Sequence, residues 1–135
     1  EAVREKLARG EVDRLLDAVS RRLEDAGHAS LHPETRLEQA SHAILGCAMV
    51  GLRAHGLRVA DRPGHQVVAI ESLAQTLGVE SERVDYYQTL RDLRNKDIYT
   101  GSAHISEAQA EEAVLEARKL TGETTLWLQA RQARA

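Results

Sequence analysis

The 135-residue sequence predicts an all-α protein, an up-and-down bundle of four to five helices. Apolar residues recur at three- and four-residue spacing in each long segment, and no segment alternates convincingly like a strand. Glycine, proline and capping residues separate these segments by short loops. The length suits one domain, so residues 1–135 are expected to share a single core.

The first expected helix covers about residues 2–26 and ends at Gly27. Arginine and glutamate separate its apolar positions, which is typical of an amphipathic helix. Residues 1–30 are also the part of the chain expected to serve as an interface helix. The apolar positions of this helix are Val3, Leu7, Val12, Leu15, Leu16, Val19 and Leu23.

The second helix is expected to begin near Pro33 and to end at about His55, before Gly56. Thr35 and Glu38 have the T-x-x-E spacing of a capping box. One face is rich in small residues, which lets a neighbouring helix backbone approach closely and predicts a central position. That face consists of Ala40, Ala43, Ile44, Cys47, Ala48 and Gly51.

Three further helices are expected in the second half of the chain. Pro63 begins one and Gly78 ends it, and Ser81 is expected to cap the next, with acidic residues in its first turn. Ser106 and Gln109 have the spacing of an S-x-x-Q capping box and predict the last helix.

Composition limits the classes of function. A net charge of −3 argues against a nonspecific duplex-DNA binder, and the low aromatic content makes base-stacking platforms scarce. The single cysteine, Cys47, excludes a disulfide framework within the chain and a zinc site built on several thiolates. The six histidines include no H-E-x-x-H zinc pattern, so neither a metal nor a cofactor is expected.

The chain is also expected to have no membrane partner. No stretch approaches the roughly 18 consecutive apolar residues that a membrane span requires. The N-terminal sequence is charged where a signal peptide would be apolar. These features, with the single cysteine, predict a cytoplasmic location.

The segment "LRNKDIYTG", residues 93–101, concentrates hydrogen-bonding side chains at the expected end of the fourth helix. Arg94 lies seven residues after Tyr87 and four after Leu90, so a continuous helix places it on the core-facing stripe. An arginine there has two interpretations. It can bind the last carbonyl groups of the helix, or it can lie in a groove and bind an anion. Asn95 beside it supplies both a donor and an acceptor.

The order of these motifs resembles that of the HEPN superfamily of prokaryotic helical-bundle proteins. The resemblance is carried by "SHAILGCAMVGLRAHGLR", "PGHQVVAIESLAQTLGV" and "YYQTLRDLRNKDIYTG", which together cover residues 41–101. It implies a HEPN-like bundle that forms a homodimer, with the polar motifs of both subunits facing one cleft. Many members are metal-independent endoribonucleases, often toxins paired with a nucleotidyltransferase-fold antitoxin, or parts of phage-defence systems. Others are noncatalytic RNA- or nucleotide-binding partners.

Active HEPN members have an arginine, usually a polar neighbour, and then a histidine after four to six intervening residues. Arg94 matches the arginine and Asn95 the neighbour, while Tyr99 stands where the histidine is expected. The resemblance therefore makes these three residues the catalytic candidates, with Arg94 stabilising transition-state charge. A tyrosine, with an ordinary pKa of about 10, is a poor general base, so Tyr99 is expected to hydrogen-bond the ligand or phosphate.

Three more residues are candidates for binding RNA or another ligand. Arg91 lies one turn before Arg94 and would add positive potential to the same cleft. Lys96 is expected at the solvated surface beside it. His65 follows Gly64 at the start of a helix, from where it could project toward the cleft.

The leading expected function is RNA binding or metal-independent RNA cleavage in a toxin-antitoxin or phage-defence context. One alternative is a noncatalytic helical partner that docks a nucleotidyltransferase or binds a nucleotide. Another is a purely structural dimerisation module, which an Arg94 buried against a carboxylate would support.

Overall fold

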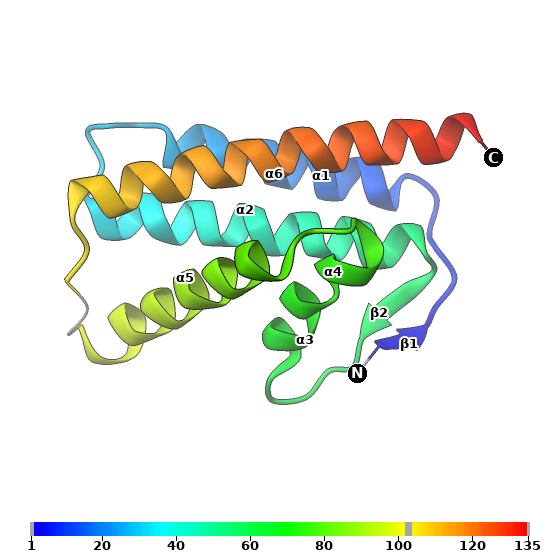
Figure 1. Cartoon of the computed structure of the whole chain (residues 1–135), viewed down its shortest axis with the longest axis horizontal. Helices are drawn as coiled ribbons and strands as arrows, with labels where there is room; N and C mark the ends of the chain where they lie inside the picture. The colour runs from blue at the N-terminus through cyan, green and yellow to red at the C-terminus, as the bar shows by residue number, and fades with distance from the viewer. Residues whose placement is uncertain (1, 102–103, 135) are drawn as a thin grey trace.

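The computed structural model describes residues 2–101 and 104–134, leaving out the side chains of residues 98–100. The described chain is mostly helical, with a small two-stranded antiparallel sheet (Figure 1). Its elements in chain order are β1 (Ala2–Arg4), α1 (Glu11–Ala26), α2 (Pro33–Ala54), β2 (Leu57–Val59), α3 (His65–Glu71), α4 (Leu73–Thr76), α5 (Ser81–Thr100) and α6 (Glu107–Ala133).

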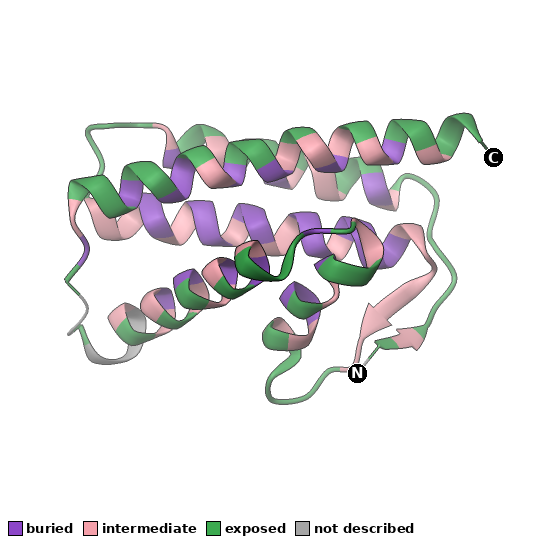
Figure 2. Cartoon of the chain, in the orientation of Figure 1, coloured by how far each residue is buried: buried purple, intermediate pink, exposed green. Residues whose placement is uncertain are grey.

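The central element is α2, which packs against α1, α5 and α6. Buried residues follow one another along nearly its whole length (Figure 2). The expected small-residue face is confirmed, since each of its members is buried: Ala40, Ala43, Ile44, Cys47, Ala48 and Gly51. Burial of this apolar surface is the main stabilising contribution to such a bundle.

The expectation of a helix over residues 2–26, with no strand in the protein, is wrong at the N-terminus. Residues 2–4 pair in antiparallel register with residues 57–59, and α1 begins only at Glu11. Gly10, at φ 74°, occupies the left-handed conformation immediately before α1. Gly56, at φ 72°, likewise turns the chain after α2, so that β2 can return along β1.

Arg53 explains why the N-terminal segment is extended rather than helical. Its side chain is 2% exposed, and its Nη1 and Nη2 donate to backbone carbonyls of Glu5 (3.1 Å), Leu57 (3.0 Å) and Lys6 (3.0 Å). The guanidinium also binds both carboxylate oxygens of Glu11, at 2.6 and 3.2 Å. These bonds connect the end of α2 to three places along the chain, and a helical N-terminal segment could not present the same carbonyls.

The contact between Glu11 and Arg53 predicts a specific acid dependence of stability. The hydrogen bond from Arg53, and next that from the backbone N–H of Ala8, lower the pKa of Glu11 below its ordinary 4.5. The stabilisation is therefore complete above about pH 4.5 and is lost as the pH falls through the folded-state pKa. Glu11→Gln is expected to lower the urea midpoint at pH 7 and to lose most of that deficit at pH 3. An equal deficit at both values would contradict this.

The helix start expected near Pro33 is confirmed, while the expected capping residues of two helices differ from the structure. Pro33 is the first residue of α2 and His32 its N-cap, so Thr35 lies inside the helix and the expected T-x-x-E box is not the start. For α5, the N-cap is Glu80 rather than Ser81. Proline at the first helical position outweighs the later threonine because its fixed φ already suits the helix.

The helices expected from Pro63 and from Ser106 have different outcomes. The helix expected from Pro63 is interrupted, because Ser72 separates α3 from α4 and its hydroxyl donates to the carbonyl of Ala69 at 2.6 Å. The capping box before α6 is confirmed: Ser106 Oγ accepts from the Gln109 N–H at 3.0 Å, and the Gln109 side chain accepts in return at 2.9 Å. None of the described helices combines the length and hydrophobicity needed to cross a membrane.

Candidate functional site

The polar motif lies on α5, and its arginine faces inward. Tyr87, Leu90 and Arg94 are 1%, 3% and 7% exposed, so the core-facing stripe expected from their spacing is present. The side chain of Tyr99 lies outside the described residues, and its expected role stays a prediction. Arg94 is therefore the motif residue whose surroundings define the site.

Arg94 donates to side chains from three helices. Its Nη2 lies 2.6 Å from Oε1 of Gln66 in α3 and 2.9 Å from Oδ1 of Asn95 in α5. Its Nη1 lies 3.2 Å from Nε2 of His42 in α2. None of these three acceptors carries a negative charge, so they orient the guanidinium without neutralising it. The burial of Arg94 matches one part of the structural-module alternative, which stays a prediction.

The guanidinium faces a hollow of about 270 Å³ between α3 and α5, here called the Arg94 pocket. The pocket brings together the expected residues Arg91, Arg94, Asn95 and His65, from segments about thirty residues apart. Gly64 adopts a left-handed φ of 84° and turns the chain into α3, which aims His65 and Gln66 at this pocket. The full lining is Pro63, Gly64, His65, Gln66, Val67, Arg91, Arg94 and Asn95.

The weaker candidates occupy different positions around this pocket. Arg91 lines it while donating to Asp92 at 2.7 Å and to Gln88 at 3.1 Å, so part of its charge is balanced. His65 is exposed, with Nδ1 3.2 Å from the carbonyl oxygen of Arg62. Lys96 is exposed and is not among the lining residues, in agreement with its expected surface position.

Two residues of the site, Gln66 and His42, were not anticipated from the sequence. Gln66 directly follows His65, which the sequence already made a candidate. Its position next to His65 could therefore have identified it as a site residue. His42 stands between buried residues on α2, and its side chain is half-buried. Burial, and then the nearby charges of Arg94 and Arg22, lower the pKa of His42, while Glu38 acts in the opposite direction.

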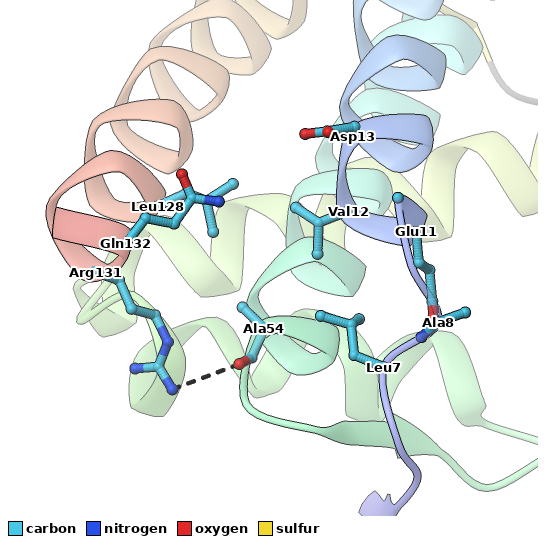
Figure 3. A pocket seen from close by; sticks show the side chains of 10 residues that line it. Leu7, Ala8, Glu11, Val12, Asp13, Ala54, Leu128, Arg131 and Gln132 are labelled. Atoms are coloured by element: carbon cyan, nitrogen blue, oxygen red, sulfur yellow. Dashed lines mark hydrogen bonds between the residues drawn. The ribbon is translucent and has the colours of Figure 1, made fainter. Parts of the chain in front are cut away.

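A larger hollow of about 300 Å³ lies at the other end of the bundle, between the N-terminal segment, α1, and the ends of α2 and α6 (Figure 3). Leu7, Val12 and Leu128 give it a mostly apolar wall. Of its three charged side chains, Glu11 binds Arg53 and Arg131 reaches the carbonyl of Ala54 at 3.5 Å, while Asp13 is exposed. Polar groups converge on the Arg94 pocket instead, which makes that pocket the candidate site.

Metal chemistry has no cluster of ligands to support it in the described part of the chain. Among those residues, no three histidine, cysteine, aspartate or glutamate side chains are grouped as a metal ion would require. The groups that line the Arg94 pocket are guanidinium, imidazole and amide groups, which bind anions and hydrogen-bonding ligands.

No protein-family model matches the chain, and no curated protein matches it either. A functional assignment therefore rests on the geometry of the Arg94 pocket and on the motif resemblance.

Proposed function

We propose that this chain is a HEPN-like domain that binds RNA through the Arg94 pocket and cleaves it without a metal ion. The observation that carries the proposal is the convergence of Arg91, Arg94, His65 and two side-chain amides on one pocket. The biological context is a cytoplasmic toxin or phage-defence system, with a nucleotidyltransferase-fold antitoxin as the expected protein partner.

The composition of the pocket suits a phosphodiester. A guanidinium offers a planar fork of N–H donors that matches two phosphate oxygens, and it stays charged at any physiological pH. The amides of Asn95 and Gln66 supply donors and acceptors for a ribose hydroxyl. A local site of this kind is compatible with a net charge of −3, because it binds one or two phosphates rather than a long duplex.

The proposal includes a homodimer, in which two such pockets face one cleft. Two Arg94 side chains would then act on one strand, and the positive potential would favour an ionised Tyr99. Light scattering at micromolar concentration is expected to give the mass of a dimer. A monomer would remove the shared cleft.

A second candidate is a noncatalytic nucleotide-binding or nucleotidyltransferase-docking domain. It is favoured by one observation, namely that Arg94 is 7% exposed and already oriented by three neutral acceptors, as a rigid binding site requires. A pocket of this kind binds a phosphate whether or not a reaction follows. Binding without cleavage is the result that would select this candidate.

Binding and cleavage of a mixed-sequence fluorescent RNA in EDTA test the proposal. Arg94→Ala is expected to weaken binding at least about tenfold, which corresponds to about 1.4 kcal/mol and to the loss of one charge-assisted hydrogen bond. Arg91→Ala, at the partly exposed rim, is expected to weaken binding about threefold, as the loss of one screened charge implies.

The matched control is Arg118→Ala, because Arg118 is an exposed arginine of α6 and its loss changes the net charge equally. It is expected to bind RNA within about twofold of the wild type. Equal weakening by Arg94→Ala, Arg91→Ala and Arg118→Ala would mean that binding is diffuse, and it would overturn the site. Circular dichroism checks that each variant is folded.

A further inference from the structure

The central helix provides an imidazole to the Arg94 site from a position fifty-two residues away in the chain. His42 Nε2 lies 3.2 Å from Nη1 of Arg94. A guanidinium only donates, so Nε2 is the acceptor in this contact and the neutral ring carries its proton on Nδ1. The atom of His42 that is able to take up a proton therefore points at Arg94.

His42 also lines a second hollow, of about 200 Å³, here called the α1/α2 groove. Arg94 lines the Arg94 pocket and His42 lines this groove, so the hydrogen bond between them joins the two hollows. Arg22 adds a positive charge to the groove and donates to Gln39 at 3.1 Å. The groove is lined by Leu15, Ala18, Val19, Arg22, His42, Leu45, Gly46 and Met49.

This arrangement accommodates the two parts of a ribonucleotide linkage. A phosphate in the Arg94 pocket would contact the guanidinium, while the ribose on its 3′-phosphate side would reach the groove beside His42. An apolar wall with one cation suits a sugar and its base better than a second phosphate.

The charged groups around His42 come from each of the three helices that meet there. Arg94 belongs to α5, Arg22 to α1 and Glu38 to α2 itself. Burial and the two arginines lower the pKa of His42, against the smaller opposing effect of Glu38. The imidazole is therefore unprotonated at neutral pH, as a general base has to be.

We infer that His42 is the general base of the RNA cleavage proposed above, with Arg94 stabilising the charged phosphorane. This inference rests on the proposed function. When a phosphate enters, Nη1 of Arg94 turns to a phosphate oxygen and releases Nε2 of His42. Nε2 takes the proton of the 2′-hydroxyl, the 2′-oxygen bonds to phosphorus, and the bond from phosphorus to the 5′-oxygen breaks. Water protonates the departing 5′-oxygen, and the imidazolium returns its proton to water.

The products of this step are a 2′,3′-cyclic phosphate and a 5′-hydroxyl end. His42 suits the role better than His65, because His42 contacts Arg94 at 3.2 Å, whereas His65 is exposed and contacts the carbonyl of Arg62. It also suits the role better than a tyrosine, because an imidazole takes up a proton at neutral pH far more readily than an un-ionised phenol.

His42→Gln separates proton transfer from positioning. The glutamine amide oxygen can accept from Arg94 near the position of Nε2, but it does not take up a proton at neutral pH. With the full chain and an oligonucleotide of one ribonucleotide within DNA, in EDTA, His42→Gln is expected to bind within about threefold of the wild type. Its cleavage is expected to be at least about 100-fold slower, the usual contribution of a general base.

The pH profile adds a readout that positioning alone would not change. Wild-type cleavage is expected to rise with pH and to level off below about pH 6.5, because the base acts in its unprotonated form and its pKa is lowered. The cleavage rate of His42→Gln is expected to lack this rise with pH. His28→Gln, at an exposed loop histidine, is the matched control and is expected to cleave as the wild type does.

Three outcomes are decisive. If His42→Gln cleaves RNA at the wild-type rate and with the wild-type pH profile, the assignment of His42 is overturned and the proposed function stands. RNA binding by the wild type without cleavage between pH 5 and 9 would overturn it as well, while supporting the noncatalytic candidate. No RNA binding by the wild type would overturn the proposed function itself.

Discussion

Arg53→Ala is expected to lower the free energy of unfolding by about 3–5 kcal/mol, the usual effect of removing one partner of a buried ion pair. Arg53 is 2% exposed and donates to the carboxylate of Glu11, to two backbone carbonyls just after β1 and to one in β2. Its removal takes away the N–H donors that Arg53 supplies to those carbonyls and to the carboxylate. The loss is expected to release β1 as well as to destabilise the bundle.

Urea unfolding followed by circular dichroism measures this effect, and amide hydrogen exchange of residues 2–4 reports on β1. Arg58→Ala is the matched control, because Arg58 lies on β2 and binds Glu5 at 2.7 Å, yet its side chain is 41% exposed. Its expected cost is below about 1 kcal/mol. A loss in Arg53→Ala as small as that in Arg58→Ala would contradict the role given to the buried network.

Gly51→Ala is expected to destabilise the protein by about 1–3 kcal/mol through overpacking. An added Cβ would lie 2.7 Å from Oγ1 of Thr76 and 2.8 Å from Cδ1 of Leu77. Both neighbours belong to the chain at the end of α4, so relieving the contact means moving that segment away from α2. The intrinsic gain of alanine over glycine in a helix, about 1 kcal/mol, offsets only part of this cost.

The matched control is Gly122→Ala, since Gly122 lies within α6 and an added Cβ there meets no described atom within 4 Å. The same substitution in a helix without a close neighbour is expected to stabilise the protein by about 0.5–1 kcal/mol. Thermal unfolding of both variants shows whether each substitution lowers or raises the stability of the protein. A gain in stability at Gly51 would show that α2 and α4 do not pack closely.

The helical fold follows from features that are local in the sequence. The small residues of α2 mark a close-packed face, and the serine-glutamine pair before α6 marks its start, so pattern alone locates both. The strands could not be found in this way. Val3 and Leu7 have helical spacing, and their true conformation depends on Arg53, a residue about fifty positions further along the chain. Local periodicity contains no information about such a contact.

The candidate site, like the fold, contains residues that the sequence predicts and others that it does not. Arg94 and Asn95 were predicted from one short motif, and the structure brings Arg91 and His65 to the same pocket. The contact with His42 depends on how α2 and α5 cross, which sequence spacing does not define. The motif on α5 has no histidine, but His42 from α2 lies beside its arginine.

The central claim is that RNA binds at the Arg94 pocket, and side-chain NMR during titration with a short RNA tests it most directly. The side-chain amides of Gln66 and Asn95 and the imidazole of His42 are expected to shift together, with one common affinity. They are expected to stop responding in Arg94→Ala. Shifts confined to other surfaces, with these three side chains unchanged at saturating RNA, would contradict the account.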